Sequence, residues 1–400
     1  MGRTAIANRK TVVYSGIGRQ FTCYEVEVSA AALTKMDTVE LMSAVQYAWP
    51  HPSRKFLYVS SSNGGPGLAG DRHFLAAFRL DASSGRLQPH GEPFALRSRP
   101  IHNSVDIAGE YLLVAYNDPS GLSIHRIEAD GTIGPEVRQT ENLDCGVYAH
   151  QIRATPSNQS VILVTRGNDA TATRPEDPGS LKVFSFKNGV LSNMASVQPG
   201  NGLGFGPRDL DFHPTRPWVY VSIERQNKLY VYQLRPDGGV SPSPLFVKNT
   251  MPDASKHMSI AGPIHIHPDG RFVYLTNRGV WSNPVGTPAG FYKGEPVYEF
   301  TDSSVAVFSI DKDTGEPTLI QTIDSDGAHP RTFSIDVSAR ILVSGSQSPI
   351  AMREGDRIRA LPAGLSIFRI GQEGRLSYVR RYDVDTGDKT QFWSGLVELA

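Results

Sequence analysis

The chain has 400 residues, and its 40 basic and 40 acidic side chains give a formal net charge of zero. A balanced chain lacks the global field that binding to nucleic acid or to an anionic membrane usually requires, so we expect neither partner. The two cysteines, Cys23 and Cys145, exclude a disulfide framework and have no metal-ligand spacing. With no apolar leader and no apolar run near the ~20 residues that span a bilayer, we expect a cytoplasmic protein.

The first predicted elements are two adjoining strands in residues 11–28, TVVYSGIGRQFTCYEVEV. Residues 30–46 are the best helix candidate, but they fall on a turn and an outer strand of a unit that recurs along the chain. The rest of the chain consists of short stretches rich in Val, Tyr and Phe, separated by Gly, Asp and Pro turns. This pattern predicts an all-β fold.

The recurring unit contains a pair of strands joined by a tight turn, and this pair occurs six times. Residues 213–224 (HPTRPWVYVSIE) align with residues 267–278 (HPDGRFVYLTNR) over the turn and its flanking strands. Four further copies occupy residues 51–62, 106–117, 155–166 and 336–347. Most copies are followed by a third strand with its own turn and by a weaker fourth strand. Four strands in each unit of roughly 50–65 residues are typical of propeller blades.

The two ends of the chain supply a seventh blade. Residues 11–28 have no inner strand before them, and residues 389–399 (KTQFWSGLVEL) form an inner strand with nothing after it. Pairing them closes the ring and hides the sheet edges. The sequence therefore predicts a single seven-bladed β-propeller domain over residues 1–400, with four-stranded antiparallel blades. Two stacked β-sandwiches are the alternative, but sandwiches do not demand such a regular unit.

Candidate functional residues follow from strand direction. The start of the inner strand and the end of the second strand meet at one face of the disc, because the two strands are antiparallel. Arg208 and Glu224 occupy these two points, sixteen positions apart. The same spacing selects Gln46 and Ser62, Ile101 and Asn117, His150 and Arg166, Gly262 and Arg278, and Arg331 and Gln347. His102, next to Ile101, is a further candidate.

These positions place four arginines, one histidine and one glutamate around a single mouth. Each alone could be a solvated loop charge, but four arginines among twelve equivalent positions favour an anion-binding mouth, because guanidinium groups offer paired donors to carboxylate or phosphate. Glu224 is expected to stay ionised among them. The long loops 167–180, 279–303 and 348–364 lie on the same face, and their Trp281, Phe291, Tyr292 and Tyr298 are expected to form pocket walls.

The sequence resembles the seven-bladed propeller lactonases, a family that includes 6-phosphogluconolactonases and carboxy-cis,cis-muconate lactonizing enzymes. Five segments carry the resemblance: YAHQIRATP (148–156), GPRDLDFHP (206–214), YVSIE (220–224), IHIHPDGRFVYLTNRG (264–279) and HPRTFSID (329–336). The resemblance implies His150, Arg208, Glu224 and Arg278 as the catalytic residues. Three positions depart from the family pattern, where Tyr148 and Asp209 replace histidines and Pro263 replaces a glutamate.

The resemblance implies hydrolysis of a lactone, with water activated by His150 or Glu224 and the oxyanion stabilised by arginine. A muconate-type cycloisomerase acting on an unsaturated di- or tricarboxylate needs the same residues and is the alternative, and a non-catalytic scaffold is a third hypothesis. We expect substrate binding by His102, Asn117, Arg166, Asn277, His329, Arg331 and Gln347. We expect a small anionic substrate, a monomer or dimer, and no cofactor or metal, because His267 of the His265–His267 pair belongs to a recurring His-Pro turn.

Overall fold

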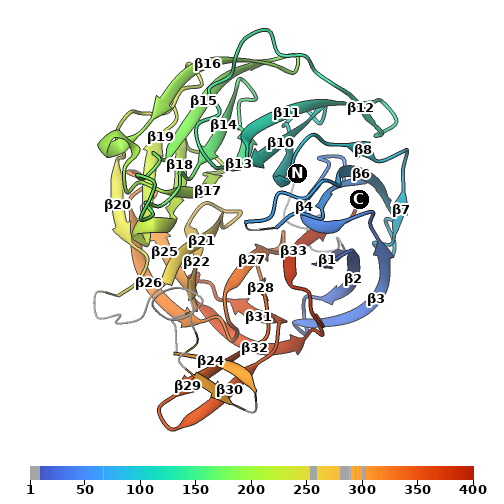
Figure 1. The fold of residues 1–400 in the computed structure, drawn as a ribbon, viewed down its shortest axis with the longest axis vertical. Coiled ribbons are helices and arrows are strands. Elements are labelled where there is room, and N and C mark those ends of the chain that lie inside the picture. The colour runs from blue at the N-terminus through green and yellow to red at the C-terminus, as the bar shows by residue number, and fades with distance from the viewer. Residues whose placement is uncertain are drawn as a thin grey trace.

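The computed structural model describes residues 10–65, 67–252, 259–279, 288, 290–292, 294–299 and 303–400. Seven antiparallel blades surround a central axis, as Figure 1 shows. The predicted all-β propeller is therefore confirmed. The best helix candidate, residues 30–46, contains the strand β3 (Ala32–Glu40) instead. No helix among the described residues is long and apolar enough to cross a bilayer.

Each blade runs outward from an inner strand next to the central axis. Blade 1 has β4 (Ala44–Pro50), β5 (Phe56–Ser62), β6 (His73–Leu80), and an outer strand split into β7 (Leu87–Pro89) and β8 (Phe94–Ala95). Blade 2 has β9 (Pro100–Val105), β10 (Tyr111–Asn117), β11 (Ser120–Ile127) and β12 (Ile133–Glu136). Blade 3 has β13 (Ala149–Ala154), β14 (Ser160–Thr165), β15 (Ser180–Lys187) and β16 (Val190–Val197).

Two short 3-10 helices belong to the blade 4 region: η1 (Pro199–Gly202) precedes its first strand, and η2 (Glu224–Gln226) connects its second and third strands. This blade has β17 (Pro207–Phe212), β18 (Trp218–Ile223), β19 (Lys228–Gln233) and β20 (Phe246–Asn249). Blade 5 has β21 (Ser259–Ile266), β22 (Phe272–Gly279), β25 (Ser304–Ile310) and β26 (Pro317–Asp324). Blade 6 has β27 (Pro330–Ile335), β28 (Ile341–Ser346), β31 (Gly364–Ile370) and β32 (Leu376–Asp383).

Blade 7 joins the two ends of the chain, as predicted. Its inner strand β33 (Gln391–Glu398) pairs antiparallel with β1 (Thr11–Ile17), followed outward by β2 (Gln20–Glu27) and then β3. In Figure 1 the red β33 lies beside the blue β1. Both edges that would otherwise be open are thereby paired, which removes a site for edge-to-edge association.

Neighbouring blades are held together by apolar side chains and by a repeated tyrosine hydrogen bond. In four blades a second-strand tyrosine donates to the carbonyl of a glycine in the next blade's outer turn, in the pairs Tyr14 and Gly85, Tyr58 and Gly131, Tyr220 and Gly315, and Tyr274 and Gly374. Gly131 has φ +89°, and a side chain there would meet the Phe56 ring. The recurring turn glycine thus permits both a left-handed backbone and close contact between blades.

We expect the Tyr220→Phe variant to be about 1–3 kcal/mol less stable than the wild type, because the Gly315 carbonyl loses its buried donor. Urea unfolding of the two proteins measures this difference. Tyr230→Phe is the matched control, since the Tyr230 hydroxyl bonds the half-buried Gln226. Equal losses in the two variants would contradict a special role for the inter-blade bond.

Two of the long loops form a structure that the sequence did not predict. Residues from the blade 5 insertion, β23 (Gly290–Tyr292) and β24 (Glu295–Glu299), join β29 (Ile350–Glu354) and β30 (Arg357–Leu361) from blade 6 in an additional sheet. This sheet lies beyond β31 and β32 in Figure 1. Tyr298 packs on its small core, whereas Phe291 is 72% exposed and Tyr292 is also exposed. Trp281 lies outside the described residues.

Candidate active site

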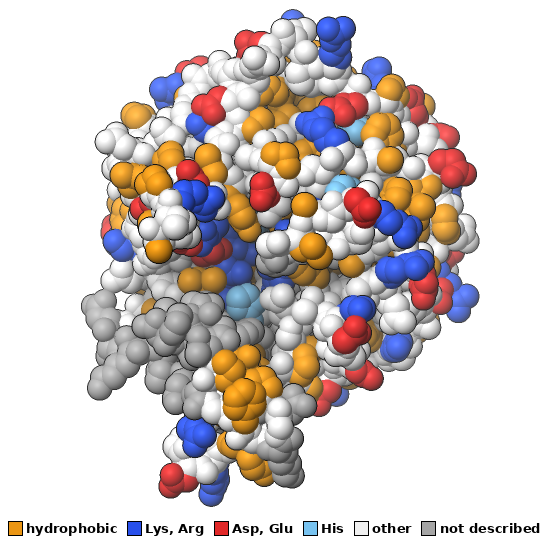
Figure 2. Space-filling view, viewed as in Figure 1, with side chains coloured by type: hydrophobic (Ala, Val, Ile, Leu, Met, Phe, Trp, Pro, Cys, Tyr) orange, Lys and Arg blue, Asp and Glu red, His pale blue; other side chains and the backbone are white. Residues whose placement is uncertain are grey.

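A β-bulge lies at the start of the inner strand in all seven blades. At each bulge the ladder skips residues on the inner strand, which are Gln46, Ile101, His150, Arg208, Gly262 with Pro263, Arg331 and Phe392. Bulges re-aim side chains next to functional sites, because the extra residue is released from the ladder. Six of the seven are the positions selected by the sixteen-residue spacing. Figure 2 shows Lys or Arg and His side chains in a hollow near the middle of one face.

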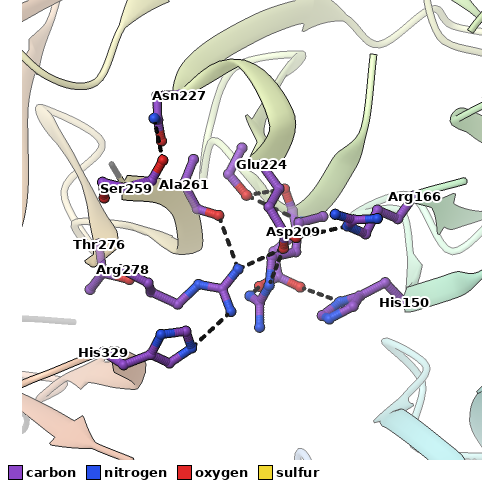
Figure 3. A network of polar contacts seen from close by, with 12 residues as sticks. His150, Arg166, Asp209, Glu224, Asn227, Ser259, Ala261, Thr276, Arg278 and His329 are labelled. Atoms are coloured by element: carbon purple, nitrogen blue, oxygen red, sulfur yellow. Dashed lines mark hydrogen bonds and ion pairs between the residues drawn. The ribbon is translucent and has the colours of Figure 1, made fainter. Parts of the chain in front are cut away.

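Glu224 is the centre of a buried ionic cluster. Its carboxylate accepts hydrogen bonds from Arg166 Nε at 2.7 Å and Arg278 Nη2 at 2.6 Å, and Arg208 Nε lies 3.1 Å away. The Glu224 amide donates to the Gly206 carbonyl at 2.9 Å, which fixes the end of β18 beside the start of β17. The three arginines come from three successive blades. Figure 3 shows Arg278 extending between Glu224 and His329.

Asp209 connects this cluster to His150. It pairs with the adjacent Arg208, and its Oδ1 lies 3.2 Å from His150 Nδ1. Both side chains are mostly buried. An ionised Asp209 can only accept, so His150 Nδ1 carries the hydrogen and Nε2 is left as the basic nitrogen. The arrangement is a histidine oriented by a carboxylate, which is the geometry of a general base.

The electrostatics agree with this assignment of charge. Burial, with Arg208 as the next influence, lowers the pKa of His150 to about 4, although Asp209 acts in the opposite direction. Burial alone would raise the pKa of Glu224, but Arg278, Arg166 and Arg208 outweigh it and hold that pKa well below its usual range. Burial would also raise the pKa of Asp209, but Arg208 and His150 outweigh the effect of burial. The pKa of Asp209 is therefore lowered as well. At neutral pH, His150 is therefore neutral between two ionised carboxylates.

The family model described as "Lactonase, 7-bladed beta-propeller" matches residues 11–350 of this chain. The chain belongs to this propeller lactonase family. A similar curated relative is a 6-phosphogluconolactonase of Bacillus subtilis (strain 168), 24% identical over 357 residues, which cover 86% of this chain and 90% of the relative. A 6-phosphogluconolactonase of Pectobacterium atrosepticum is 28% identical over 315 residues, covering 79% of this chain and 81% of the relative.

Solved structures of this propeller fold superpose on nearly the whole chain. The periplasmic gluconolactonase of Pseudomonas aeruginosa gives a TM-score of 0.71 at 18% identity, covering 98% of this chain and 100% of that structure. A putative 6-phosphogluconolactonase of Bacteroides fragilis gives 0.66 at 17% identity and covers both chains completely. At these identities the likeness shows the fold alone.

The remaining predicted site residues lie at different places around the mouth and within the blades. His329 donates from Nδ1 to the Gly279 carbonyl at 3.2 Å, and its Nε2 faces Arg278 Nη1 at 3.4 Å. Arg331 donates from Nε to the Phe392 carbonyl at 3.0 Å. His102 is fully buried below the mouth, with its ring 4.1 Å from that of Tyr47. Its role in binding stays a prediction.

Asn277 requires a correction, because its side chain does not reach the mouth. It is completely buried and bonds Thr250 and Ser304 within the blade. Successive side chains of a strand point to opposite faces, so Asn277 faces away from the site that Arg278 enters. Asn117 is the last residue of β10, and Gln347 directly follows β28. Among the described residues, neither has a hydrogen bond or ion pair to the Glu224 cluster.

Two carboxylates outside the predicted set of site residues adjoin the cluster. Asp209 was noted only as a departure from the family pattern, yet it is the direct partner of His150. Asp169, from the loop 167–180, accepts a hydrogen bond from Arg166 Nη2 at 2.9 Å and also pairs with Arg225.

The described residues contain no group of three His, Cys, Asp or Glu side chains suited to a metal ion. A cavity of about 280 Å³ lies among the inner strands and is lined by Trp49, His265, Phe333 and Trp393 among others.

Proposed function

We propose that this protein hydrolyses the ring ester of a small acidic lactone at the channel mouth. The observation that carries the proposal is the buried His150–Asp209 pair, which adjoins the arginines held by Glu224. A neutral histidine with an oriented, unprotonated nitrogen can activate water, and a cluster of guanidinium groups can stabilise an oxyanion. The relatives named as 6-phosphogluconolactonases support a lactone that carries a phosphate.

In the proposed reaction, His150 Nε2 removes a proton from water as the water oxygen attacks the ring carbonyl carbon. Asp209 keeps Nδ1 protonated and stabilises the imidazolium that forms. The ring C–O bond then breaks, and the departing alkoxide takes the proton back from Nε2. The product is an open-chain hydroxy acid, which ionises at neutral pH and releases one proton for each lactone consumed.

Arg208 and Arg278 are the proposed oxyanion donors, and Glu224 is their positioning residue. Glu224 is a poor candidate for the base because three arginines already occupy its oxygens and lower its pKa. Holding the guanidinium groups in place before the reaction removes the need to reorganise them when negative charge develops on the carbonyl oxygen. Burial, followed by Arg208, lowers the pKa of Arg278 to about 10, so it remains charged at neutral pH.

The pH dependence of kcat/KM tests the assignment of the base. Because the active form of His150 is neutral and its pKa is lowered to about 4, we expect kcat/KM to rise with pH through about 4 and then to stay level through neutrality. The rate must be corrected for uncatalysed lactone hydrolysis at high pH. A rise centred near 6.5, the ordinary value for histidine, would contradict the buried pair as the reacting group.

Acid release from a panel of lactones tests the function itself. The panel should contain 6-phosphogluconolactone, neutral aldono-lactones and muconolactones, with proton uptake or release followed at constant pH and absorbance followed in parallel. We expect proton release to be faster with acidic lactones than with neutral ones. A change in ultraviolet absorbance without proton release would instead favour the cycloisomerase, and no reaction with any member would favour the scaffold.

A further inference from the structure

The charges of the mouth divide into two groups. Around Glu224, each arginine has a carboxylate partner: Arg166 pairs with Glu224 and Asp169, Arg208 with Glu224 and Asp209, and Arg278 with Glu224. These arginines already have an internal counter-ion. A second anionic group on a substrate therefore needs cations from elsewhere in the mouth.

Arg99 and Arg331 are two such cations. Arg99 immediately precedes β9, is only 3% exposed, and donates from Nε to Gln46 Oε1 at 3.0 Å. Arg331, on the bulge of β27, donates from Nε to the Phe392 carbonyl. Among the described residues, neither has a carboxylate within salt-bridge distance, and the buried Arg99 Nη2 has no hydrogen-bond acceptor.

The two guanidinium groups meet at one aromatic ring. The guanidinium carbon of Arg331 lies 3.7 Å from the centroid of Phe392, and that of Arg99 lies 5.6 Å from the same centroid. Phe392 is the bulged residue of β33 in blade 7, which follows blade 6 with Arg331, whereas Arg99 precedes β9 of blade 2. The cation–π contacts hold both groups close to the mouth without neutralising either charge.

Such a pair is unfavourable unless something else compensates it. Burial lowers the pKa of Arg99, and burial followed by Arg208, Arg278 and Arg99 lowers the pKa of Arg331 well below its usual range. Tyr148 acts in the opposite direction on the pKa of both arginines. Buried charges are normally paired, so two neighbouring cations without a carboxylate indicate a site completed by an external anion.

We propose that Arg99 and Arg331 form the subsite for a second anionic group of the substrate, a phosphate or a carboxylate remote from the lactone carbonyl. The site separates binding from chemistry: the Arg99–Arg331 pair holds the remote charge, while His150, Arg208 and Arg278 act on the ring ester. The inference rests on the proposed lactonase function for the identity of the substrate, but the anion site itself can be tested without turnover.

Calorimetric titration with inorganic phosphate and, separately, with citrate at constant ionic strength tests the subsite. Wild type is compared with Arg99→Met, Arg331→Met and the charge-conserving Arg99→Lys and Arg331→Lys variants. Arg97→Met is the matched control, because Arg97 is near Arg99 in sequence but pairs with Glu136 at 2.7 Å. We expect each methionine variant to weaken binding of one or both anions by about tenfold to a hundredfold, with partial recovery in the lysine variants. The anion that binds with the higher affinity shows whether phosphate or carboxylate is the preferred group.

Thermal unfolding separates binding from a structural role. Because Arg99 is an unpaired buried cation, Arg99→Met is expected to unfold at or above the wild-type temperature without added anion, and to lose the stabilisation that phosphate or citrate gives the wild type. In kinetics, KM for an acidic lactone should rise at least tenfold more than KM for a neutral lactone. Anion binding equal to wild type in both methionine variants would overturn the proposal. Anion binding lost in the variants, with no lactone hydrolysed by wild type, would leave the subsite standing and remove the proposed function.

Discussion

Replacing His150 with glutamine is expected to lower kcat/KM for an acidic lactone by about 10²–10⁴-fold, the range for loss of a general base. Glutamine keeps a polar group of similar length beside Asp209 but cannot accept and return a proton near neutral pH. Because His150 is on a bulge outside the β13 ladder, the blade should fold normally. Acid release at constant pH measures the loss, and the urea unfolding midpoint checks the fold.

The Asp209→Asn variant provides a second test of the same pair. Asp209 raises the pKa of His150, so its removal is expected to move the acidic limb of the kcat/KM profile to lower pH. The plateau should also fall, because asparagine can donate to Nδ1 and favour the wrong tautomer. A lower plateau with an unmoved limb would indicate that Asp209 only supports the local structure. For the His150→Gln variant described above, full activity would show that His150 takes no part in the mechanism.

Replacing Glu224 with glutamine is expected to decrease the free energy of unfolding by about 3–5 kcal/mol, the cost of leaving buried charge uncompensated. Glu224 is only 7% exposed and is the shared partner of three arginines. Activity should fall with stability, because Arg208 and Arg278 lose the group that orients them. Urea unfolding and acid release, measured on the same preparation, test both expectations.

A double variant distinguishes a charge effect from a packing effect. Adding Arg278→Met to Glu224→Gln removes the arginine whose carboxylate partner is Glu224 alone, so stability is expected to recover in part while activity stays low. Glu136→Gln is the control, since Glu136 forms an exposed pair with Arg97 and should change the free energy of unfolding by less than about 1 kcal/mol. A loss no larger than that of the control would contradict the cluster around Glu224 as a buried ionic network.

The fold was predictable because the repeat is local. Each copy of the strand-turn-strand unit specifies its own blade, and the unmatched strands at the two ends leave one way to close the ring. The additional sheet was not predictable, because β24 and β29 pair between insertions of different blades, about fifty residues apart in sequence. No local pattern fixes the register of such a pair. The expected pocket walls therefore became, at Phe291 and Tyr292, exposed parts of a separate sheet.

The candidate site was predictable in position but not in pairing. The sixteen-residue spacing selected the bulged residues His150, Arg208 and Arg331, since a bulge recurs at the same place in each blade. The pairing of one carboxylate with three arginines depends on side-chain geometry across three blades. Arg99 escaped the spacing rule because it lies two residues before the bulge of its strand, the place that Tyr148 and His329 occupy in theirs. Applying that second offset would have found it.

The most direct measurement of the central claim is proton release from a phosphorylated aldono-lactone near neutral pH, by wild type and by His150→Gln at equal concentration. Hydrolysis by His150 predicts release by wild type well above the uncatalysed rate, in a ratio of one proton to one lactone, and a rate at least about a hundredfold lower in the variant. Equal rates in the two proteins, or no acceleration by wild type, would contradict the claim that this mouth is a lactone-hydrolysing site.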